Sequence, residues 1–241
     1  MKIFFIFTVT NLLKNMIRDF KNLLFPRICA CCEENLLKHE NVICTFCRND
    51  LPLCQNFFDG DHDLHKILYG RVRLNQAASL FYFEKKSNVQ QLIHDLKYRN
   101  NRAVSAFLGY WISEILLNAD WQNQIDVVIP VPLHKRRLRK RGFNQVEGFG
   151  KAIAEKLSAK YEDKILLRKS STKTQVFKSR FARTDVVQGN FYTKNIDLLN
   201  DKHILLVDDL ATTGATLEAC WMSLNSAKNI KFNIATMAIS K

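Results

Sequence analysis

Two adjacent aspartates follow a short apolar run that begins at His203, and small and hydroxyl-bearing residues come next, at 211–216. A helix-like segment follows, and the free backbone N–H groups and positive dipole at the start of a helix attract phosphate. Carboxylates would repel a phosphate, so the acid pair suits sugar hydroxyls or a bridging Mg²⁺. The pattern therefore predicts a sugar-phosphate site. Its candidate residues are Asp208, Asp209, Ala211, Thr212, Thr213, Gly214, Ala215 and Thr216.

The alternative for this stretch is a helix start with incidental acids, because Asp and Thr are good N-cap residues. Two acids followed by the run TTGAT exceed what capping needs. The threonine hydroxyls add donors, and Gly214 permits a backbone approach that a side chain would block. An ordinary nucleotide P-loop is excluded, because the lysine of G-x-x-x-x-G-K-[ST] is absent.

Cysteines gather near the start of the chain, where six of the seven lie between positions 29 and 54. Two C-x-x-C pairs separated by eleven residues have the spacing of a zinc ribbon or knuckle. The predicted ligands of a structural zinc are Cys29, Cys32, Cys44 and Cys47. A disulfide framework is the alternative, although nothing marks the chain as secreted. Cys31 and Cys54 are left over as possible substitutes, and Cys220 is expected in the core.

The net charge of +13 points to a polyanionic partner such as nucleic acid, phosphate or an anionic membrane. Two acid-free segments, 133–146 and 168–184, concentrate this charge, and we expect both to be loops at the same end of the fold. A solvated surface without a ligand is the alternative. The candidate nucleic-acid or pyrophosphate-binding residues are Lys135, Arg136, Arg137, Arg139, Lys140, Arg141, Lys178, Arg180 and Arg183.

The elements that must position these residues alternate between strand and helix. Strands are predicted at 76–83, 126–133, 164–168, 203–207 and 232–239. Helices are predicted at 89–98, 104–117, 143–158 and 215–226. Such alternation predicts an α/β fold with a parallel sheet covered on both faces, whose site lies beyond the carboxyl ends of the strands. The acid pair would then lie just past the end of a central strand.

The first residues predict an amphipathic helix with an apolar stripe, which would dock on the protein's own body or, alternatively, on a membrane surface or partner. The longest apolar run, 3–9, is far shorter than the roughly 20 residues of a membrane span. Lys2 imitates the start of a secretory signal, but no small-residue cleavage site follows. We therefore expect a cytoplasmic protein. Its predicted parts are an N-terminal helix (1–25), a zinc module (26–58) and an α/β domain (59–241).

The stretch ILLVDDLATTGAT resembles the phosphoribosyl-pyrophosphate (PRPP) motif of type I phosphoribosyltransferases, in which paired acids meet the ribose hydroxyls and a small-residue loop holds the 5′-phosphate. The order of cysteine knuckles, LIHDLKYRN, VIPVPLHKRRLRKRGFNQ, KTQVFKSRFARTDVVQGNF and this motif resembles ComF-type competence proteins of bacterial natural transformation. The resemblance implies a type I phosphoribosyltransferase-like sheet, a pyrophosphate loop after VIPVPL and a flexible loop at 170–190.

Two functions stay open at this point. One is a cytoplasmic competence protein that binds PRPP with Mg²⁺ and handles single-stranded DNA during DNA uptake; by resemblance, its partner would be a helicase of the uptake apparatus. The other is a phosphoribosyltransferase that moves the pentosyl group of PRPP to an unidentified base, with Mg²⁺ and cations stabilising the departing pyrophosphate. No residue is assigned a catalytic role.

Overall fold

The structure is a computed structural model that describes residues 16, 24, 26–55, 62–99, 101–122, 124–169 and 190–240. The chain divides into two compact units, Met1–Asp50 and Leu51–Lys241. Our division at residues 25 and 58 stays a prediction. Of the predicted N-terminal helix, the structure describes Met16 and Leu24, which are both helical with exposed side chains.

The first unit is a small knuckle closed by backbone contacts. Ile28 and Asn35 form an antiparallel bridge, and the N–H of Cys29 donates to Glu34 O at 2.7 Å. A short helix, α2 (Thr45–Asp50), carries the last cysteine of the two pairs. The local hydrogen bonds bring the two C-x-x-C turns to the same side of this unit.

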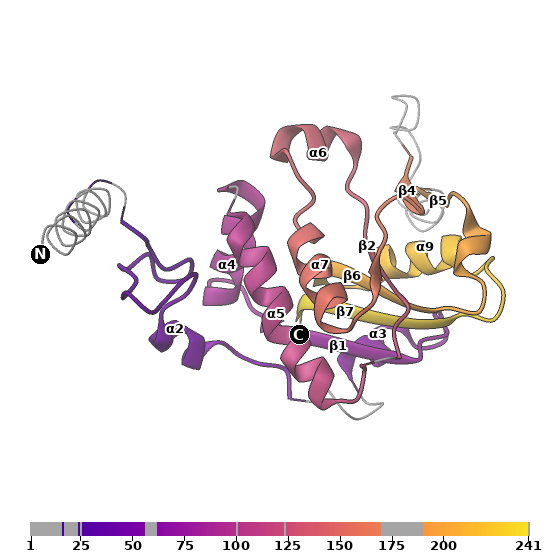
Figure 1. Ribbon diagram of the computed structural model, residues 1–241, viewed down its shortest axis with the longest axis horizontal. Helices are drawn as coiled ribbons and strands as arrows, with labels where there is room; N and C mark the ends of the chain where they lie inside the picture. Colours follow the sequence, from indigo (N-terminus) through magenta and orange to yellow (C-terminus); the bar gives the residue numbers. More distant parts are fainter. Residues whose placement is uncertain are drawn as a thin grey trace, which may run out of the picture. The chain divides into compact units, whose positions relative to one another are not determined.

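The second unit is built on a five-stranded parallel sheet with strand order β1-β7-β6-β2-β3 (Figure 1). Its strands are β1 (Gln76–Phe83), β2 (Val127–Pro130), β3 (Lys160–Tyr161), β6 (His203–Ala211) and β7 (Lys231–Ser240). Residues 127–129 of β2 and 204–207 of β6 are buried apolar runs, as expected for strands that are covered on both faces. Because all five run the same way, their carboxyl ends share one edge of the sheet.

One face of the sheet is covered by α3 (Asp63–Leu68) and α9 (Ala215–Leu224). Ile204 and Leu206 of β6 belong to a buried cluster that also contains Leu68 of α3 and Leu217 of α9. Cys220 is fully buried in the same cluster, which confirms its predicted place in the core. The cluster fixes where α9 begins relative to the end of β6.

The other face is covered by α4 (Asn88–Tyr98), α5 (Arg102–Asn118) and α7 (Glu147–Lys156) (Figure 1). The α7 helix approaches β6 closely, since a Cβ on Gly150 would lie 3.1 Å from Val207 Cγ2. Ser105 of α5 joins the two helices, because its Oγ accepts from the N–H of Phe149 at 2.8 Å. This packing carries α4 and the start of α7 to the carboxyl edge of the sheet.

A separate antiparallel pair joins β4 (Leu166–Arg168) to β5 (Phe191–Thr193), and η3 (Ile196–Leu199) follows. The N–H of Lys169 donates to Asn190 O at 2.8 Å, one step beyond the pair. We call this arrangement the β4–β5 clip. It holds together the two ends of segment 170–189, which is the predicted flexible loop without residue 190 and lies outside the described residues.

Two elements differ from the sequence-based expectation. β6 does not end at Val207 but continues to Ala211, because β7 stays paired with it through Ala211 and Ile239. Residues 135–141, expected as a loop, form helix α6 (Lys135–Arg141). His134 caps its start, Gly142 ends it with φ 77°, and its straight-chain residues are good helix formers.

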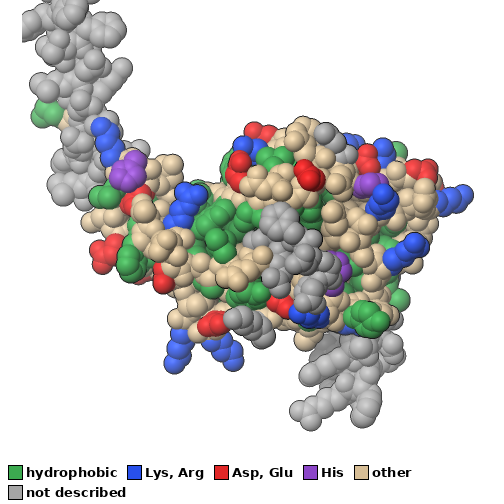
Figure 2. All heavy atoms as spheres, turned by 90° about the horizontal axis from the view of Figure 1, so that it is seen from below, with side chains coloured by type: hydrophobic (Ala, Val, Ile, Leu, Met, Phe, Trp, Pro, Cys, Tyr) green, Lys and Arg blue, Asp and Glu red, His purple; other side chains and the backbone are tan. Residues whose placement is uncertain are grey.

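The cations of α6 are concentrated in one short helix. On the face shown in Figure 2, which is seen from below, lysine and arginine side chains are scattered among acidic and other residues. Helix α6 instead carries six cations in seven residues and buries none of them. Within the described residues, no helix has the length and apolarity to cross a membrane.

Candidate functional site

Residues 211–216 join β6 to α9 and contain the predicted 5′-phosphate site, so we call them the phosphate loop. Gly214 is the N-cap of α9 with φ 74°, a conformation that side-chain-bearing residues rarely adopt. A Cβ here would also lie 2.7 Å from Leu68 Cδ2. The side chains of Thr212, Thr213 and Thr216 are exposed. The loop thus presents backbone donors and hydroxyls to solvent at the carboxyl edge of the sheet.

Arg71 fixes this loop from outside the motif. Its Nη2 donates to Thr213 O at 2.9 Å, and its Nη1 contacts Glu218 Oε2 at 2.8 Å. It also donates to the backbone oxygen of Ile67, at the end of α3. One guanidinium therefore ties α3, the phosphate loop and the first turn of α9 together.

The acid pair lies inside β6, so its predicted position just past the strand is wrong. Asp209 donates its own N–H to Asp208 Oδ1 at 2.9 Å. Burial, and then the charge of Asp209, raise the pKa of Asp208 well above its usual range, although Lys97 and Arg168 oppose the shift. The strand thus holds two carboxylates whose simultaneous ionisation is costly without a nearby cation.

Lys97 supplies such a cation from the end of α4. Its Nζ lies 3.0 Å from Asp209 Oδ2, and both side chains are largely buried, with 21% and 18% exposed. This ion pair connects two segments that are far apart in the sequence but adjacent at the carboxyl edge of the sheet. A divalent cation at the acid pair would compete with Lys97 for the same carboxylate.

A pocket of about 540 Å³ opens beside this ion pair. We call it the basic pocket. It is lined by Lys97, Tyr98, Arg137, Lys140, Arg141 and Phe143. The guanidinium of Arg141 lies 5.6 Å from the centre of the Tyr98 ring, within range of a cation–π contact. Lys97 thus belongs to both the acid pair and the pocket.

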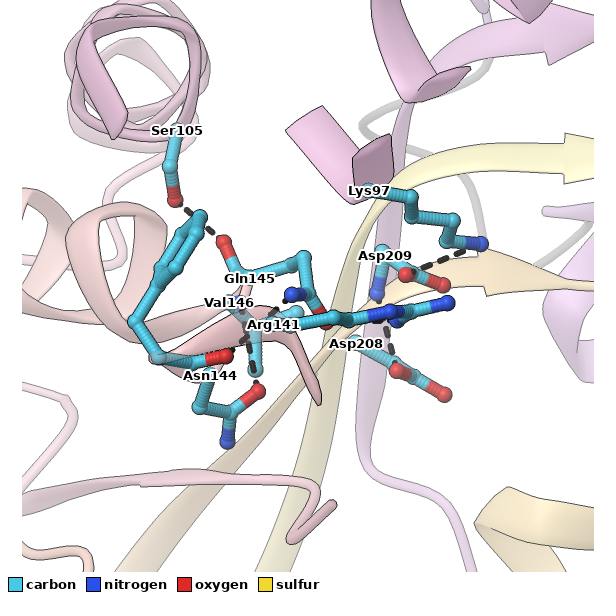
Figure 3. Close-up of polar contacts among 9 residues, drawn as sticks. Lys97, Ser105, Arg141, Asn144, Gln145, Val146, Asp208 and Asp209 are labelled. Atoms are coloured by element: carbon cyan, nitrogen blue, oxygen red, sulfur yellow. Dashed lines mark hydrogen bonds and ion pairs between the residues drawn. The ribbon is translucent and has the colours of Figure 1, made fainter. Parts of the chain in front are cut away.

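The motif RGFNQ supplies Arg141 and Phe143 to the pocket lining, and its remaining polar residues hold these two in place (Figure 3). Asn144 Nδ2 donates to Val131 O at 3.1 Å, which ties the turn to the end of β2. Gln145 is buried; its Oε1 accepts from Arg141 Nη1 at 2.7 Å, and its backbone oxygen accepts from Ser105 Oγ at 2.5 Å. In Figure 3 the Arg141 side chain points from Gln145 toward the acid pair. The motif therefore orients a cation.

The remaining predicted basic residues divide into two groups. Lys135, Arg136, Arg137, Arg139 and Lys140 are exposed on α6, and Arg137 and Lys140 reach the pocket. Lys178, Arg180 and Arg183 lie outside the described residues. Arg168, at the base of the clip, stacks over the Phe191 ring at 5.1 Å, and burial lowers the pKa of its guanidinium.

The four predicted zinc ligands come together in the first unit. The sulfur atoms of Cys29, Cys32, Cys44 and Cys47 all lie within 4.8 Å of one another. Tetrahedral coordination with Zn–S bonds of about 2.3 Å places sulfurs about 3.8 Å apart. The Cys32 and Cys44 sulfurs are already 3.8 Å apart. The donor set therefore fits a metal such as zinc with only a small contraction.

Backbone N–H donors stabilise the thiolate form of a cysteine in the cluster. The N–H groups of Cys31 and Cys44 donate to Cys29 Sγ at 3.4 and 3.3 Å. Burial raises the pKa of the Cys29 thiol, but backbone hydrogen bonds outweigh it and lower the pKa to about 7. Cys31 itself is buried beside the cluster, while Cys54 belongs to the second unit and packs in its core.

His62 lies in a polar stretch of the sequence, but its side chain is buried. His62 is 2% exposed, and backbone N–H groups of Leu64 and Ser79 lie 3.1 Å from its two ring nitrogens. Burial lowers the pKa of His62 to about 4. This histidine therefore caps α3 as a neutral ring.

Several residues of the site were not singled out from the sequence. Arg71 lies in no quoted motif, and its importance depends on tertiary contacts. Lys97 and Tyr98 belong to the string LIHDLKYRN and Gln145 to RGFNQ, but these strings were used as markers of resemblance and not as site residues. The signal that could have found Lys97 is its place at the end of a predicted helix that must cover the sheet near the acid pair.

Sequence comparison relates the chain to proteins named for DNA handling. DNA utilization protein YhgH of Escherichia coli O6:H1 is 29% identical over 130 residues, 52% of this chain and 56% of that protein. Competence protein ComFC of Bacillus subtilis is 26% identical over 198 residues, 76% of this chain and 77% of that protein. ComFC of Streptococcus pneumoniae is 34% identical over 105 residues, 43% and 44% of the two chains. The chain thus spans only about half the length of YhgH.

No protein-family model matches the chain. Among solved structures, a hypoxanthine phosphoribosyltransferase of Staphylococcus aureus covers 64% of this chain and 71% of its own, with 14% identity and a TM-score of 0.33. That similarity is too low to bear on function. The chain is therefore similar in sequence to competence and DNA utilization proteins of the ComF type.

Proposed function

We propose that the protein binds PRPP with Mg²⁺ at the acid pair and phosphate loop, and holds single-stranded DNA on α6 and in the basic pocket. The observation that carries this proposal is that Lys97 contacts Asp209 and also lines the basic pocket. A sugar-phosphate site and a polyanion site would then be neighbours. The names of the relatives, DNA utilization and competence proteins, support the DNA half.

The roles at the first site follow from chemistry. Asp208 and Asp209 would accept from ribose hydroxyls, and the phosphate loop with the α9 N-terminus would hold the 5′-phosphate. Mg²⁺, when bound, would neutralise the pyrophosphate next to these carboxylates. We propose zinc for the cysteine cluster, because thiolates in a tetrahedral set prefer it.

The cellular setting is the less direct part of the proposal. Handling of an incoming DNA strand during natural transformation takes place in the cytoplasm, so we assign the protein to that compartment. A helicase of the DNA-uptake apparatus would be its partner, as the ComF resemblance implies. Phosphoribosyl transfer from PRPP to a base is the second candidate, and the strand–phosphate loop–helix site favours it as well.

Calorimetry of PRPP binding with and without Mg²⁺ tests the first site. We expect Mg²⁺-dependent binding, and Thr213→Ala should weaken it by about 1 kcal/mol through the loss of one hydrogen bond. If Thr213→Ala binds PRPP as tightly as the wild type, the Thr213 hydroxyl does not contact the ligand. No binding of PRPP at all would refute the sugar-phosphate half of the proposal.

Salt-dependent DNA binding tests the second site. Log affinity should fall linearly with log salt, by about 0.7 per phosphate contact. Alanine at Arg136, Arg137, Arg139 and Lys140 should lower both the affinity and this slope. The matched control replaces Lys160, Lys202, Lys228 and Lys231, which are exposed near the amino ends of the strands. This control removes the same charge from the opposite edge of the sheet, and it should leave the salt dependence of DNA binding unchanged.

The same preparation separates the two functions. Pyrophosphate release that requires a particular base, together with DNA binding that disappears near physiological salt, would establish the transferase and refute DNA handling. Salt-resistant DNA binding without base-dependent turnover would establish the opposite. PRPP should compete with DNA, because both ligands would meet Lys97.

A further inference from the structure

The basic pocket combines an aromatic wall with cations. Tyr98 is the last residue of α4, and its side chain is 63% exposed although the neighbouring Leu96 is fully buried. Phe143, which also lines the pocket, is 6% exposed. Tyr98 therefore contributes little to the core and presents its ring to the pocket. Exposed aromatic faces beside cations are the usual means of holding an unpaired base.

The cations of the pocket differ in how they are held. Arg141 is oriented by Gln145 and lies near the Tyr98 ring. In the described part of the chain, no carboxylate pairs with Arg137 or Lys140. These two side chains are therefore free to meet phosphates, while Arg141 is fixed at the base of the pocket.

The two walls together decide the class of ligand. A pyrophosphate alone would pair with the cations but would not stack on the aromatic ring. A free base would stack on the ring but would not pair with the cations. A nucleotide with its flanking phosphates would make both kinds of contact. The pocket volume of about 540 Å³ lies within the usual range for small-molecule sites.

We propose that the basic pocket holds one nucleotide of a single strand, with its base stacked on Tyr98 and the adjoining phosphates on Arg137 and Lys140. This inference rests on the proposed DNA binding and adds a base-contacting residue to it. The contact is sequence-tolerant, because every base offers a flat face to the ring.

The test compares two fluorescein-labelled strands of equal length by anisotropy. One is oligothymidylate, and the other carries the same phosphodiesters with abasic tetrahydrofuran residues. Tyr98→Leu should weaken oligothymidylate binding about fivefold or more, the effect of losing one base–aromatic stack. It should leave binding of the abasic strand within twofold, because no phosphate contact is lost.

Matched variants isolate the ring. Tyr98→Phe retains the aromatic face and should bind both strands like the wild type. Tyr69→Leu removes another exposed tyrosine, one that does not line the pocket, and should change neither affinity. The emission of Trp111, Trp121 and Trp221, all in the second unit, reports whether each variant is folded.

The salt slope adds a second readout. Tyr98→Leu should leave it unchanged, whereas Arg137→Ala with Lys140→Ala should lower it by about 1.4 for two phosphates. Equal weakening of both strands by Tyr98→Leu, or none, would overturn the pocket proposal alone. If the wild type binds neither strand, the proposed DNA function itself fails. Displacement of the strand by free thymine would overturn the proposal in favour of an acceptor-base site.

Discussion

The ammonium of Lys97 lies 3.0 Å from a carboxylate oxygen of Asp209, although 111 residues separate the two in the sequence. The pair closes the space between the end of α4 and the acid pair of β6. A ligand that binds Asp209, or one that reaches Lys97 from the basic pocket, would therefore disturb this contact. Ligands at the two places are expected to affect each other through one side chain.

Asp209→Asn should move the two binding activities in opposite directions. PRPP binding with Mg²⁺ should weaken by roughly 1 to 3 kcal/mol, because a charged acceptor is lost. DNA binding should strengthen about two- to threefold at low salt, since Lys97 is released and a nearby negative charge is gone. Calorimetry and anisotropy on one preparation measure both.

The control for this change is Asp197→Asn, which removes an exposed carboxylate of η3 and the same net charge. It should leave PRPP affinity unchanged. Parallel loss of both activities in Asp209→Asn would contradict the shared role of Lys97.

Gly214→Ala should destabilise the second unit and weaken PRPP binding. A positive φ costs an alanine about 1 kcal/mol, and the clash with Leu68 should add about 1 to 3 kcal/mol of overpacking. Gly70→Ala is the matched control, because Gly70 has φ 69° with nothing within 4 Å of an added Cβ. Equal losses of unfolding free energy in the two variants, measured by tryptophan fluorescence, would show that the Leu68 contact has no effect.

Cys44→Ser should release the metal and unfold the first unit while the second stays folded. Structural zinc contributes the folding free energy of such a knuckle, so three thiolates should not hold it. Elemental analysis should give one zinc per wild-type chain and far less in the variant. All tryptophans lie in the second unit, so their unfolding midpoint should not move. Cys31→Ser, outside the set of four, should retain zinc.

His62 should make the second unit less stable in acid. Its folded pKa is lowered to about 4 from an ordinary 6.5, so the unfolded chain binds the proton first as pH falls. The stabilisation is complete above pH 6.5 and should decrease by about 2 kcal/mol between pH 7 and pH 5. Denaturant titrations followed by tryptophan fluorescence measure this loss.

His62→Asn can still cap α3 but cannot titrate, so its free energy of unfolding should depend less on pH. His94→Asn, at an exposed histidine, serves as the control and should behave like the wild type. An unchanged pH dependence in His62→Asn would assign the acid sensitivity to other groups.

Features encoded by neighbouring residues were predictable from the sequence. The cysteine cluster follows from two short turns, and its four sulfurs meet as expected. The phosphate loop also follows from local signals, because a glycine and threonines precede a helix. The alternation of strands and helices correctly predicted a parallel sheet with both faces covered.

Features that depend on distant partners were not predictable. The acid pair lies inside β6 because β7 remains paired with β6 beyond Asp209. No residue near Asp208 in the sequence indicates this pairing. Lys97 and Arg71 reach the site only because helix packing brings the ends of α4 and α3 to the sheet edge. A run of six cations was interpreted as a loop, although His134 and Gly142 supply both ends of a helix.

The β4–β5 clip also bears on how this protein can tolerate change. Because three residue pairs and one further hydrogen bond join the two ends, we expect the rest of the fold to tolerate changes in the length of the segment between them. Doubling the length of a closed loop costs only about 0.6 kcal/mol. Segment 170–189 is therefore a place where insertions, deletions and whole replacements can accumulate during evolution, or be made at the bench, without loss of the scaffold.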